Sequence, residues 1–352
     1  MNEYKVIGLM SGTSMDGVDL AYCIFKEDNF KYTFEIKYCE TIPYTDEWYK
    51  ALKKLPSESA YEYAKQHVLY GHYLGNLVSD FINKHKIAVD FVASHGHTVF
   101  HQPHLKFTSQ IGEGAALAQA SGQKVVCDFR TSDVAAGGQG APLVPIGDEQ
   151  LFGTYDYCLN LGGFANISMA KQTKRVAFDI CPANIVLNYF ANFRGKPYDR
   201  DGKMAANGIF NKDLYDELNS LDFYEKQPPK SLGREWMEQH IMPLFDKYPI
   251  SPEDCACTFC EHVAYQIGRA IENDNKKSVL VTGGGAFNAY LIERIQHNTK
   301  AQVIIPQNNI VNYKEALIFA FLGVLRIKQK NNCLSSVTGA AKDVCGGALY
   351  LP

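Results

Sequence analysis

The feature that most constrains how this chain folds is an internal repeat of strands and glycine turns. In the first copy, three segments with the pattern of strands span residues 6–10, 18–25 and 32–36, and a glycine turn follows the first of them. In the second copy, the corresponding segments span residues 157–161, 164–169 and 175–178, with Gly162-Gly163 as the turn. Helical periodicity follows each copy. The repeat predicts an α/β chain of two duplicated lobes, each built on a mixed sheet and facing the other.

The length of the chain agrees with two lobes. It has 352 residues, 46% of them hydrophobic, and a single core usually stops growing near about 250–300 residues. We place the first lobe at residues 1–145 and the second at 146–352, with the option that the C-terminal helix packs back on the first lobe. The segment 137–142, rich in glycine, is the expected crossover between them.

Charge and cysteine content narrow the range of partners. The formal net charge is −3, from 35 Lys and Arg against 38 Asp and Glu, so no basic excess indicates binding to nucleic acid or to an anionic membrane. No apolar run approaches the roughly 20 residues that span a bilayer, and the N-terminal segment does not resemble a signal peptide. The ten cysteines are therefore expected to be reduced thiols of a cytoplasmic protein whose partner is a small molecule.

One group of cysteines has a spacing that invites comparison with a zinc site. Cys255, Cys257 and Cys260 follow Ser251 and Pro252, which are typical of a helix N-cap and first turn. No second pair of Cys or His follows at zinc-site distance. Structural thiols on a helix are therefore preferred over a metal site.

Glycine turns in both lobes suit a nucleotide. A hairpin turn without Cβ atoms lets backbone N–H groups approach phosphate oxygens, and two opposed hairpins can clasp a polyphosphate. In the first turn, the hydroxyls of Ser11, Thr13 and Ser14 add donors, and Asp16 is placed to hold Mg²⁺ directly or through water. A third glycine run, residues 283–285, joins a strand to a helix N-terminus, which favours an anion. Taken alone, the first turn also fits an ordinary hairpin turn that binds no ligand.

Competing signatures are absent from the sequence. It contains no Gly-x-x-x-x-Gly-Lys-Ser/Thr run, no Gly-x-Gly-x-x-Gly run and no Gly-x-Ser-x-Gly elbow. A P-loop, a dinucleotide-binding domain and a serine hydrolase are therefore disfavoured.

Polar residues at strand ends are candidates for binding and activating an acceptor. Asp179 follows a strand and is either the cap of the next helix or a carboxylate that takes a proton from an attacking hydroxyl or water. Arg130 is either a surface cation or a substrate clamp. His95 and His97 flank a glycine, and hydrogen bonding to a sugar or a structural role in the turn is preferred over zinc.

With these residues in view, the chain resembles the anhydro-N-acetylmuramic acid kinase family along nearly its whole length. The N-terminal match is the segment from Gly8 to Asp19, GLMSGTSMDGVD. Further matching motifs follow in order along the chain: residues 94–98, 128–130 with 133–145, 160–163, 233–235, 282–285 with Asn288, 314–316 and 336–340. A coincidental match of this many collinear motifs is implausible.

The resemblance implies a duplicated ribonuclease-H-like fold, related to hexokinase, actin and the heat-shock 70 ATPase, with an ATP cleft between the lobes. It implies an enzyme that uses ATP and Mg²⁺ to open hydrolytically the 1,6-anhydro bridge of anhydro-N-acetylmuramic acid and to phosphorylate its O6. The product, N-acetylmuramate 6-phosphate, belongs to peptidoglycan recycling. A bacterial cytoplasmic enzyme and a homodimer are also implied.

The resemblance also assigns roles to residues. Nucleotide contacts are expected from Ser11, Gly12, Thr13, Ser14, Met15, Asp16, Gly17, Val18, Asp19, Gly162, Gly163, Gly283, Gly284, Gly285 and Asn288, with Asp16 as the candidate metal ligand. The sugar is expected to be held by His97, Thr98, Arg130 and Glu315. Asp179 corresponds to the catalytic base, which would take a proton from the water that attacks the anomeric carbon.

The loop after Asp179 departs from the family's pattern. The family usually has Asp-Thr-Gly-Pro-Gly-Asn there, whereas this chain has Cys181 and Ala183 in place of the two glycines. A Cβ at such positions raises the question of an altered rate or substrate. Two alternatives therefore stand beside the anhydro-sugar kinase: a kinase for a different sugar, and a non-catalytic nucleotide-binding sensor of the same fold.

Overall fold

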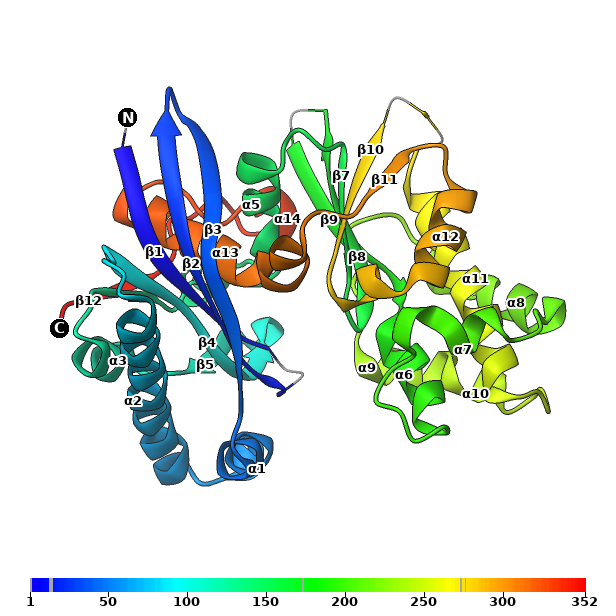
Figure 1. The fold of residues 1–352 in the computed structure, drawn as a ribbon, viewed down its shortest axis with the longest axis horizontal. Helices are drawn as coiled ribbons and strands as arrows, with labels where there is room; N and C mark the ends of the chain where they lie inside the picture. Colours follow the sequence, from blue (N-terminus) through cyan, green and yellow to red (C-terminus); the bar gives the residue numbers. More distant parts are fainter. Residues whose placement is uncertain (1, 13–14, 173, 273, 276) are drawn as a thin grey trace. The chain divides into compact units, whose positions relative to one another are not determined.

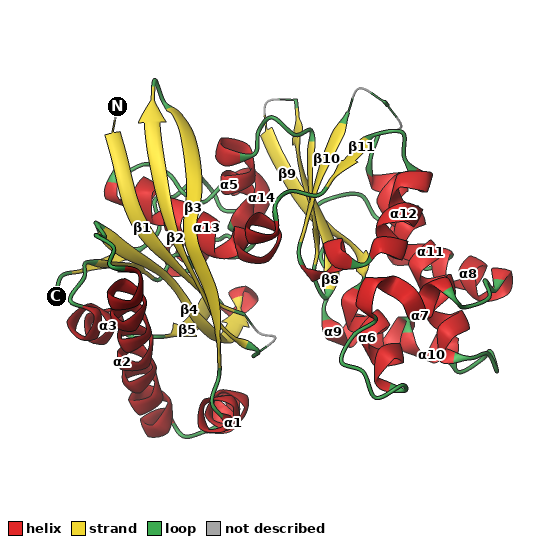
Figure 2. Ribbon diagram, in the orientation of Figure 1, coloured by secondary structure: helices red, strands yellow, loops and turns green. Residues whose placement is uncertain are grey.

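A computed structural model describes residues 2–12, 15–172, 174–272, 274–275 and 277–352 of the chain. Contacts divide the chain into two compact units, Met1–Leu151 with Tyr313–Pro352, and Phe152–Asn312 (Figure 1). Strands and helices occur in both units (Figure 2). The chain is therefore α/β in both parts, as the internal repeat predicts.

The sheet of the first unit is an antiparallel meander continued by parallel strands. Its described strands are β1 (Asn2–Ser11), β2 (Gly17–Asp28), β3 (Lys31–Pro43), β4 (Phe91–Gln102), β5 (Phe107–Ile111), β6 (Val125–Cys127) and β12 (Ala348–Tyr350). They follow the order β12-β6-β4-β1-β2-β3, and β5 pairs with β4. β1 is antiparallel to β2 and parallel to β4. β4 extends to Gln102 because β5 supplies partners for residues 97–102.

The sheet of the second unit repeats this arrangement. Its described strands are β7 (Tyr157–Leu161), β8 (Phe164–Lys171), β9 (Lys174–Pro182), β10 (Ser278–Thr282) and β11 (Gln302–Ile304). The order β11-β10-β7-β8-β9 corresponds strand by strand to β6-β4-β1-β2-β3 of the first unit. β7 is antiparallel to β8 and parallel to β10. The duplication predicted from the sequence is therefore confirmed by topology and strand direction.

Helices cover both faces of the first sheet. They are α1 (Asp46–Lys54), α2 (Ala60–His85), α3 (Gly114–Ser121), α4 (Thr131–Ala135), α5 (Val144–Leu151), α14 (Ser335–Thr338) and most of α13 (Asn308–Ile327). Tyr70 and Leu74 of α2 enter an apolar core with Ile7 of β1. On the other side of β1, a Cβ atom on Gly8 would lie 2.0 Å from the carbonyl oxygen of Ala316 in α13. The glycine therefore permits close packing of strand and helix.

In the second unit, a long central helix organises the others. The helices are α6 (Asn184–Asn192), α7 (Lys203–Ala206), α8 (Lys212–Asn219), α9 (Arg234–His240), α10 (Met242–Phe245), α11 (Pro252–Ala270) and α12 (Ala289–Asn298). α11 contacts α6, α7, α8, α12 and β9. Its residues Phe259, Val263 and Ile267 are fully buried in the core of this unit. Within the described ranges, no helix combines the length and apolarity that crossing a bilayer requires.

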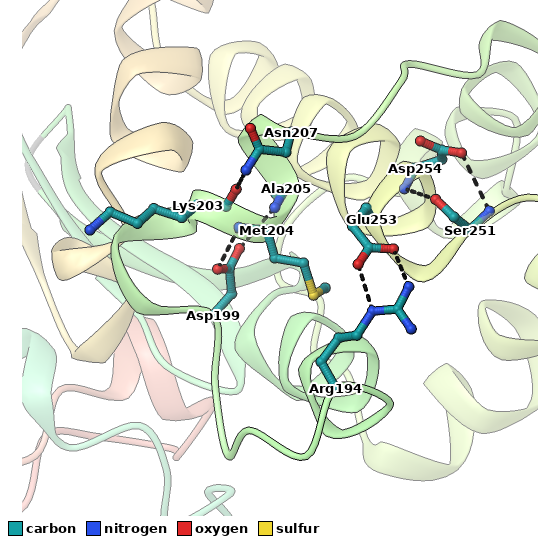
Figure 3. Close-up of polar contacts among 9 residues, drawn as sticks. All are labelled: Arg194, Asp199, Lys203, Met204, Ala205, Asn207, Ser251, Glu253 and Asp254. Carbon is teal, nitrogen blue, oxygen red and sulfur yellow. Dashed lines mark hydrogen bonds and ion pairs between the residues drawn. The ribbon is translucent and has the colours of Figure 1, made fainter.

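The start of α11 follows the capping signals in its sequence. The Ser251 hydroxyl accepts the N–H of Asp254 at 3.1 Å, and the Asp254 carboxylate accepts the N–H of Ser251 at 3.3 Å (Figure 3). Glu253, also in the first turn, pairs through both carboxylate oxygens with Arg194, at 2.6 and 2.7 Å (Figure 3). The cysteines of this helix, Cys255, Cys257 and Cys260, are free and buried. The predicted helix is confirmed, and its three cysteines are buried free thiols.

The limits of the two units differ from the predicted division at residues 145 and 146. Residues 313–352 lie with the first unit, although the sequence assigned them to the second with the option of packing back. α13 crosses the limit, and its helical geometry is interrupted at Tyr313, where φ is −117° and ψ is 16°. The expected crossover at 137–142 lies inside the first unit. The Asp133 carboxylate connects it to the C-terminal part of that unit, because it accepts the Gly140 N–H and the Thr338 hydroxyl, each at 2.7 Å.

Candidate functional site

The β1–β2 turn carries the first group of predicted nucleotide contacts. Thr13 and Ser14 lie outside the described residues. The N–H of Met15 donates to the carbonyl of Gly12 at 3.3 Å, and Met15 has a φ of 55°, in the left-handed region. Asp16 is exposed at the end of the turn. Its carboxylate is therefore accessible to a ligand.

The beginning of β2 combines two packing residues with one polar group. A Cβ atom on Gly17 would lie 2.4 Å from the carbonyl oxygen of Ile42, so close pairing with β3 requires glycine here. Val18 is fully buried in the core. The carboxylate of Asp19 accepts the Thr41 hydroxyl at 2.5 Å. Of these three predicted nucleotide residues, only Asp19 presents a charged side chain.

Acidic side chains gather around Asp19. Burial raises the pKa of Asp19 to about 6, the hydrogen bond from Thr41 opposes the shift, and the charges of Asp16 and Glu315 add to it. Asp16, the predicted metal ligand, and Glu315, a predicted sugar residue, thus both act electrostatically on Asp19, a predicted nucleotide residue. Carboxylates under mutual repulsion suit a bound cation.

Ser11 is placed differently from its predicted role as a phosphate donor. Its side chain is buried, with only 2% of its surface exposed. The hydroxyl contacts the hydroxyls of Tyr44 at 2.5 Å and Tyr70 at 2.8 Å, and Nδ1 of His97 at 3.2 Å. Its hydrogen-bonding capacity is therefore used inside the protein, which a reading of the glycine turn alone did not reveal.

Arg130 is a held side chain and not a free surface cation. Its guanidinium donates to Nε2 of His95 at 3.0 and 2.9 Å and to the carbonyl of Gly140 at 2.6 Å. Burial lowers the pKa of Arg130 to about 10, with the charge of Glu315 opposing the shift, so the group stays cationic at neutral pH. The Thr98 hydroxyl accepts a hydrogen bond from Gln110 at 3.4 Å. Of the predicted sugar residues, Arg130 and Glu315 carry opposite charges that act on each other.

Three consecutive residues of α13 have three separate functions. Lys314 is buried and pairs with the buried Asp148 of α5 at 2.7 Å. Glu315 is exposed. Ala316 lies under Gly8 of β1. The segment thus anchors the helix on both sides of the one side chain that it offers to a ligand.

In the second unit, the glycine run after β10 packs against the end of β7. Gly283 has a φ of 83°, and a Cβ atom there would lie 2.6 Å from Oδ1 of Asn160. A Cβ atom on Gly285 would meet Cβ of Leu161 at 2.6 Å, whereas Gly284 is exposed and has room for one. A single 3₁₀ turn, Gly284–Phe287, separates the strand from α12, so the α-helix starts later than expected. Asn288 caps α12 by accepting the Leu291 N–H at 2.9 Å.

The Gly162-Gly163 turn is open on its outer side. A Cβ atom on Gly163 would meet only Cβ of Ile185, at 3.8 Å. The carbonyl of Gly163 accepts the N–H of Ala183 at 2.8 Å, and that of Gly162 accepts the N–H of Asn184 at 3.2 Å. The turn is thereby attached to the start of α6. Packing within the described part of the unit does not require glycine at residue 163, which leaves ligand approach as a reason for it.

Asp179 is not a helix cap. α6 begins at Asn184 and its N-cap position is Ala183, four residues beyond Asp179. Asp179 lies within β9, where its N–H donates to the carbonyl of Lys230 at 3.0 Å and its carboxylate accepts the N–H of Leu232 at 2.9 Å. Burial raises the pKa of Asp179, and the hydrogen bond from Leu232 opposes the shift. The segment at 230–232, which the sequence did not connect with Asp179, holds this carboxylate.

The side chains that replace the family's glycines point into the core. Cys181 and Ala183 are fully buried members of the apolar core of the second unit. The φ of Ala183 is −137°, outside the left-handed region. A bulge between Asp179 and Cys181 on β9 accompanies this placement. The two Cβ atoms therefore fill core space.

Metal sites built from protein side chains alone are not found in the described part of the chain. No group of three or more His, Cys, Asp or Glu residues there could hold an ion. His95 and His97 form hydrogen bonds, His95 with Arg130 and Gly96 and His97 with Ser11. A metal that also uses phosphate oxygens needs fewer protein ligands.

Comparison with known proteins identifies the family of the chain. The family model for anhydro-N-acetylmuramic acid kinase matches residues 4–352. The anhydro-N-acetylmuramic acid kinase of Sulfurimonas denitrificans is 32% identical over 375 residues, which cover 99% of this chain and 100% of that one. The Pseudomonas paraeruginosa protein of the same name is 34% identical over 373 residues, 98% of each chain. Among solved structures, component A of (R)-2-hydroxyglutaryl-CoA dehydratase from Acidaminococcus fermentans has a TM-score of 0.47 and 13% identity, over 90% of this chain and 96% of that one. The chain belongs to the anhydro-N-acetylmuramic acid kinase family.

Proposed function

We propose that Asp179 is the catalytic base of an ATP-dependent kinase that opens the 1,6-anhydro bridge of anhydro-N-acetylmuramic acid and phosphorylates its O6. The kinase function follows from membership of the family over the full chain. The observation that supports the role of Asp179 is its half-buried carboxylate, which a backbone N–H holds at 2.9 Å. A fixed carboxylate of raised pKa is suited to accept a proton.

The proposed chemistry couples hydrolysis to phosphoryl transfer. Asp179 takes a proton from water, whose oxygen forms a bond to the anomeric carbon. The bond between that carbon and the bridging O6 breaks, and O6 attacks the γ-phosphorus of ATP, releasing ADP. Arg130 and Glu315 would orient the sugar, while the backbone of the Gly162-Gly163 turn would hold phosphate oxygens.

Mg²⁺ fits the acidic residues of the first unit. Asp16 is exposed, and its charge helps to raise the pKa of Asp19 to about 6, an effect secondary to burial. A divalent cation would relieve this repulsion, and Mg²⁺ in phosphate-transfer sites is commonly held by one or two carboxylates together with the substrate's phosphates. Asp16 would be a ligand, directly or through water, and the ion would neutralise charge on the phosphates.

The identity of the sugar is tested by turnover. With ATP, Mg²⁺ and anhydro-N-acetylmuramic acid, the chain should release ADP and N-acetylmuramate 6-phosphate in equal amounts. Unbridged N-acetylmuramic acid is the control acceptor, because it lacks the bond whose cleavage releases O6. A higher kcat/KM on the unbridged sugar would favour a kinase for a different sugar.

A methyl group on Gly163, in the Gly162-Gly163 turn, should weaken nucleotide binding. Gly163→Ala adds a Cβ that the described residues can accommodate, so its effect should fall on the ligand. Loss of one hydrogen bond to a charged phosphate, about 1.5 kcal/mol, corresponds to roughly a tenfold higher KM for ATP. Steady-state kinetics with varied ATP measures this KM. An unchanged value would contradict the binding of phosphate by the Gly162-Gly163 turn.

The hydrogen bond from Leu232 should set the pH dependence of the reaction. Replacing the Leu232 amide by an ester, through incorporation of the matching α-hydroxy acid, removes the N–H that lowers the pKa of Asp179. The pKa then rises, so the acidic limb of the pH profile of kcat moves to higher pH. Well above that limb the base is ionised in both proteins, so turnover there should be unchanged. Leu232→Ala retains the N–H and should leave the limb in place. If the ester leaves it in place too, this bond does not tune the base.

A cytoplasmic location and a homodimer stay predictions from the family resemblance. Cell fractionation tests the first. The molar mass of the purified chain in solution tests the second.

A further inference from the structure

His97 is hydrogen-bonded to a closed ring of three hydroxyl groups that come from three separate parts of the chain. Ser11 ends β1, Tyr44 follows β3, and Tyr70 lies in α2. The three hydroxyl oxygens lie 2.5 Å (Ser11 to Tyr44), 2.6 Å (Tyr44 to Tyr70) and 2.8 Å (Tyr70 to Ser11) apart. Nδ1 of His97, which is paired with Ser11 in the β1–β4 register, completes the group at 3.2 Å from the Ser11 oxygen.

The direction of every hydrogen bond in this group follows from counting protons, because each hydroxyl has only one. The Tyr70 hydroxyl donates to Ser11, so the contact between Tyr44 and Tyr70 requires Tyr44 to donate. The Tyr44 proton is then used, and Ser11 must donate to Tyr44. Ser11 has no proton left for His97, so Nδ1 of His97 must carry the proton that joins them.

We propose that the Ser11–Tyr44–Tyr70 ring fixes His97 in the Nδ1–H tautomer, so that Nε2 serves as a hydrogen-bond acceptor for a hydroxyl of the sugar. Tyr44 and Tyr70 are thus positioning residues that act through Ser11. The second half of this inference rests on the proposed role of His97 in binding the sugar. The site selects a ligand that donates a hydroxyl proton at this position over one that presents only an acceptor.

The protonation state of His97 agrees with this assignment. Burial lowers the pKa of His97 to about 4, so the imidazole is neutral at pH 7 and has one donor and one acceptor nitrogen. Among the described residues, the ring forms its hydrogen bond with Ser11, through Nδ1. Nε2 has no hydrogen-bond partner among those residues, which agrees with its proposed use by a ligand.

His95 provides a contrast within the same strand. Its Nε2 accepts hydrogen bonds from Arg130, so its Nδ1 carries the proton and donates to the carbonyl of Gly96 at 2.8 Å. Both histidines thus have the Nδ1–H form, but the acceptor nitrogen of His95 is already used. Arg130 occupies one acceptor, and the sugar is expected to use the other.

Removal of the Tyr44 hydroxyl should reverse the tautomer of His97. In Tyr44→Phe, Tyr70 still donates to Ser11, and the Ser11 proton has lost its acceptor. Donation to Nδ1 of His97 is then the arrangement that leaves no buried hydroxyl proton unpaired. The proton of His97 moves to Nε2, which becomes a donor. The same aromatic ring remains, so packing changes little.

The tautomer is read directly by NMR of protein labelled with ¹⁵N-histidine at pH 7. Two-bond ¹H–¹⁵N spectra distinguish a protonated ring nitrogen from an unprotonated one, and the His97 signals are assigned by their loss in His97→Gln. The expected result is protonated Nδ1 in the unaltered chain and protonated Nε2 in Tyr44→Phe. Tyr73→Phe is the matched control, because the Tyr73 ring packs on Tyr44 and Tyr70 without entering the hydroxyl ring. Protonated Nε2 in the unaltered chain, or no reversal in Tyr44→Phe, would overturn the proposal.

Kinetics test the role of the acceptor nitrogen separately. If a sugar hydroxyl donates to Nε2, the reversed tautomer places two donors against each other, and the KM for the sugar should rise about tenfold. The KM for ATP should stay unchanged, as should both constants in Tyr73→Phe. A reversed tautomer with an unchanged KM for the sugar would overturn the acceptor role of His97. Because the spectra need no sugar, they hold whichever acceptor the kinase prefers.

Discussion

Replacing Asp179 by Asn is expected to lower kcat by about 10²–10⁴-fold, the usual loss when a general base is removed. Asn has nearly the same shape, and its amide oxygen can still accept the Leu232 N–H that holds Asp179 at 2.9 Å. It cannot take a proton from the attacking water. The loss should therefore appear in kcat, while the KM for ATP stays close to that of the unaltered chain.

The measurement is release of ADP and phosphosugar at saturating ATP and anhydro-N-acetylmuramic acid. Asp222→Asn is a suitable control, because this carboxylate is exposed and lies outside the proposed site. Both variants lose one negative charge, so a fall confined to Asp179→Asn cannot arise from net charge. Turnover of Asp179→Asn at the rate of the unaltered chain would exclude Asp179 as the base.

The second large effect is expected on stability, from Gly8→Ala. A Cβ atom at this position would lie 2.0 Å from the carbonyl oxygen of Ala316, 2.9 Å from its carbonyl carbon and 3.0 Å from Cβ of Ala320. The nearest obstacle is helix backbone, which cannot rotate away as a side chain can. Either β1 or α13 must shift, at a cost of about 3 kcal/mol, the upper end of the range for overpacked cores. Thermal unfolding should show a lower Tm for this variant.

Gly163→Ala is the matched control for this experiment. It also adds one methyl group to a glycine, but the nearest described atom would be 3.8 Å away. Its Tm should stay near that of the unaltered chain while its KM for ATP rises, the reverse of the pattern for Gly8→Ala. Equal Tm values for Gly8→Ala and the unaltered chain would show that the contact between β1 and α13 relaxes without cost.

Elements with local signals were predicted well from the sequence. The meander strands follow from alternating apolar residues, and the start of α11 follows from Ser251, Pro252 and Asp254, which act within one helical turn. The duplication was visible because both copies keep the order of strand, glycine turn and two strands, and the two sheets have the same topology. Such signals depend on neighbours in the chain, so a sequence displays them directly.

The sequence proposes residues for the site, but it does not reveal the direction of their side chains. The position of Ser11 beside the glycine turn suggests a hydrogen-bond donor to phosphate. The partners of its hydroxyl instead lie 33, 59 and 86 residues away in the chain. Asn288 likewise serves as the cap of α12, and Asp179 is held by a segment 53 residues away. The hydrogen-bond partners of such a polar side chain become its neighbours only when the chain folds, so the local sequence does not reveal them.

The same reason explains the limits of the units and the altered loop. Residues 313–352 join the first unit because Gly8 admits α13 against β1, a contact between residues 8 and 316. Cys181 and Ala183 replace glycines without entering the left-handed region, because a bulge on β9 accompanies Cβ atoms that fill the core. Repetition, periodicity and capping are properties of the chain, whereas packing and the use of each proton depend on residues that folding brings together.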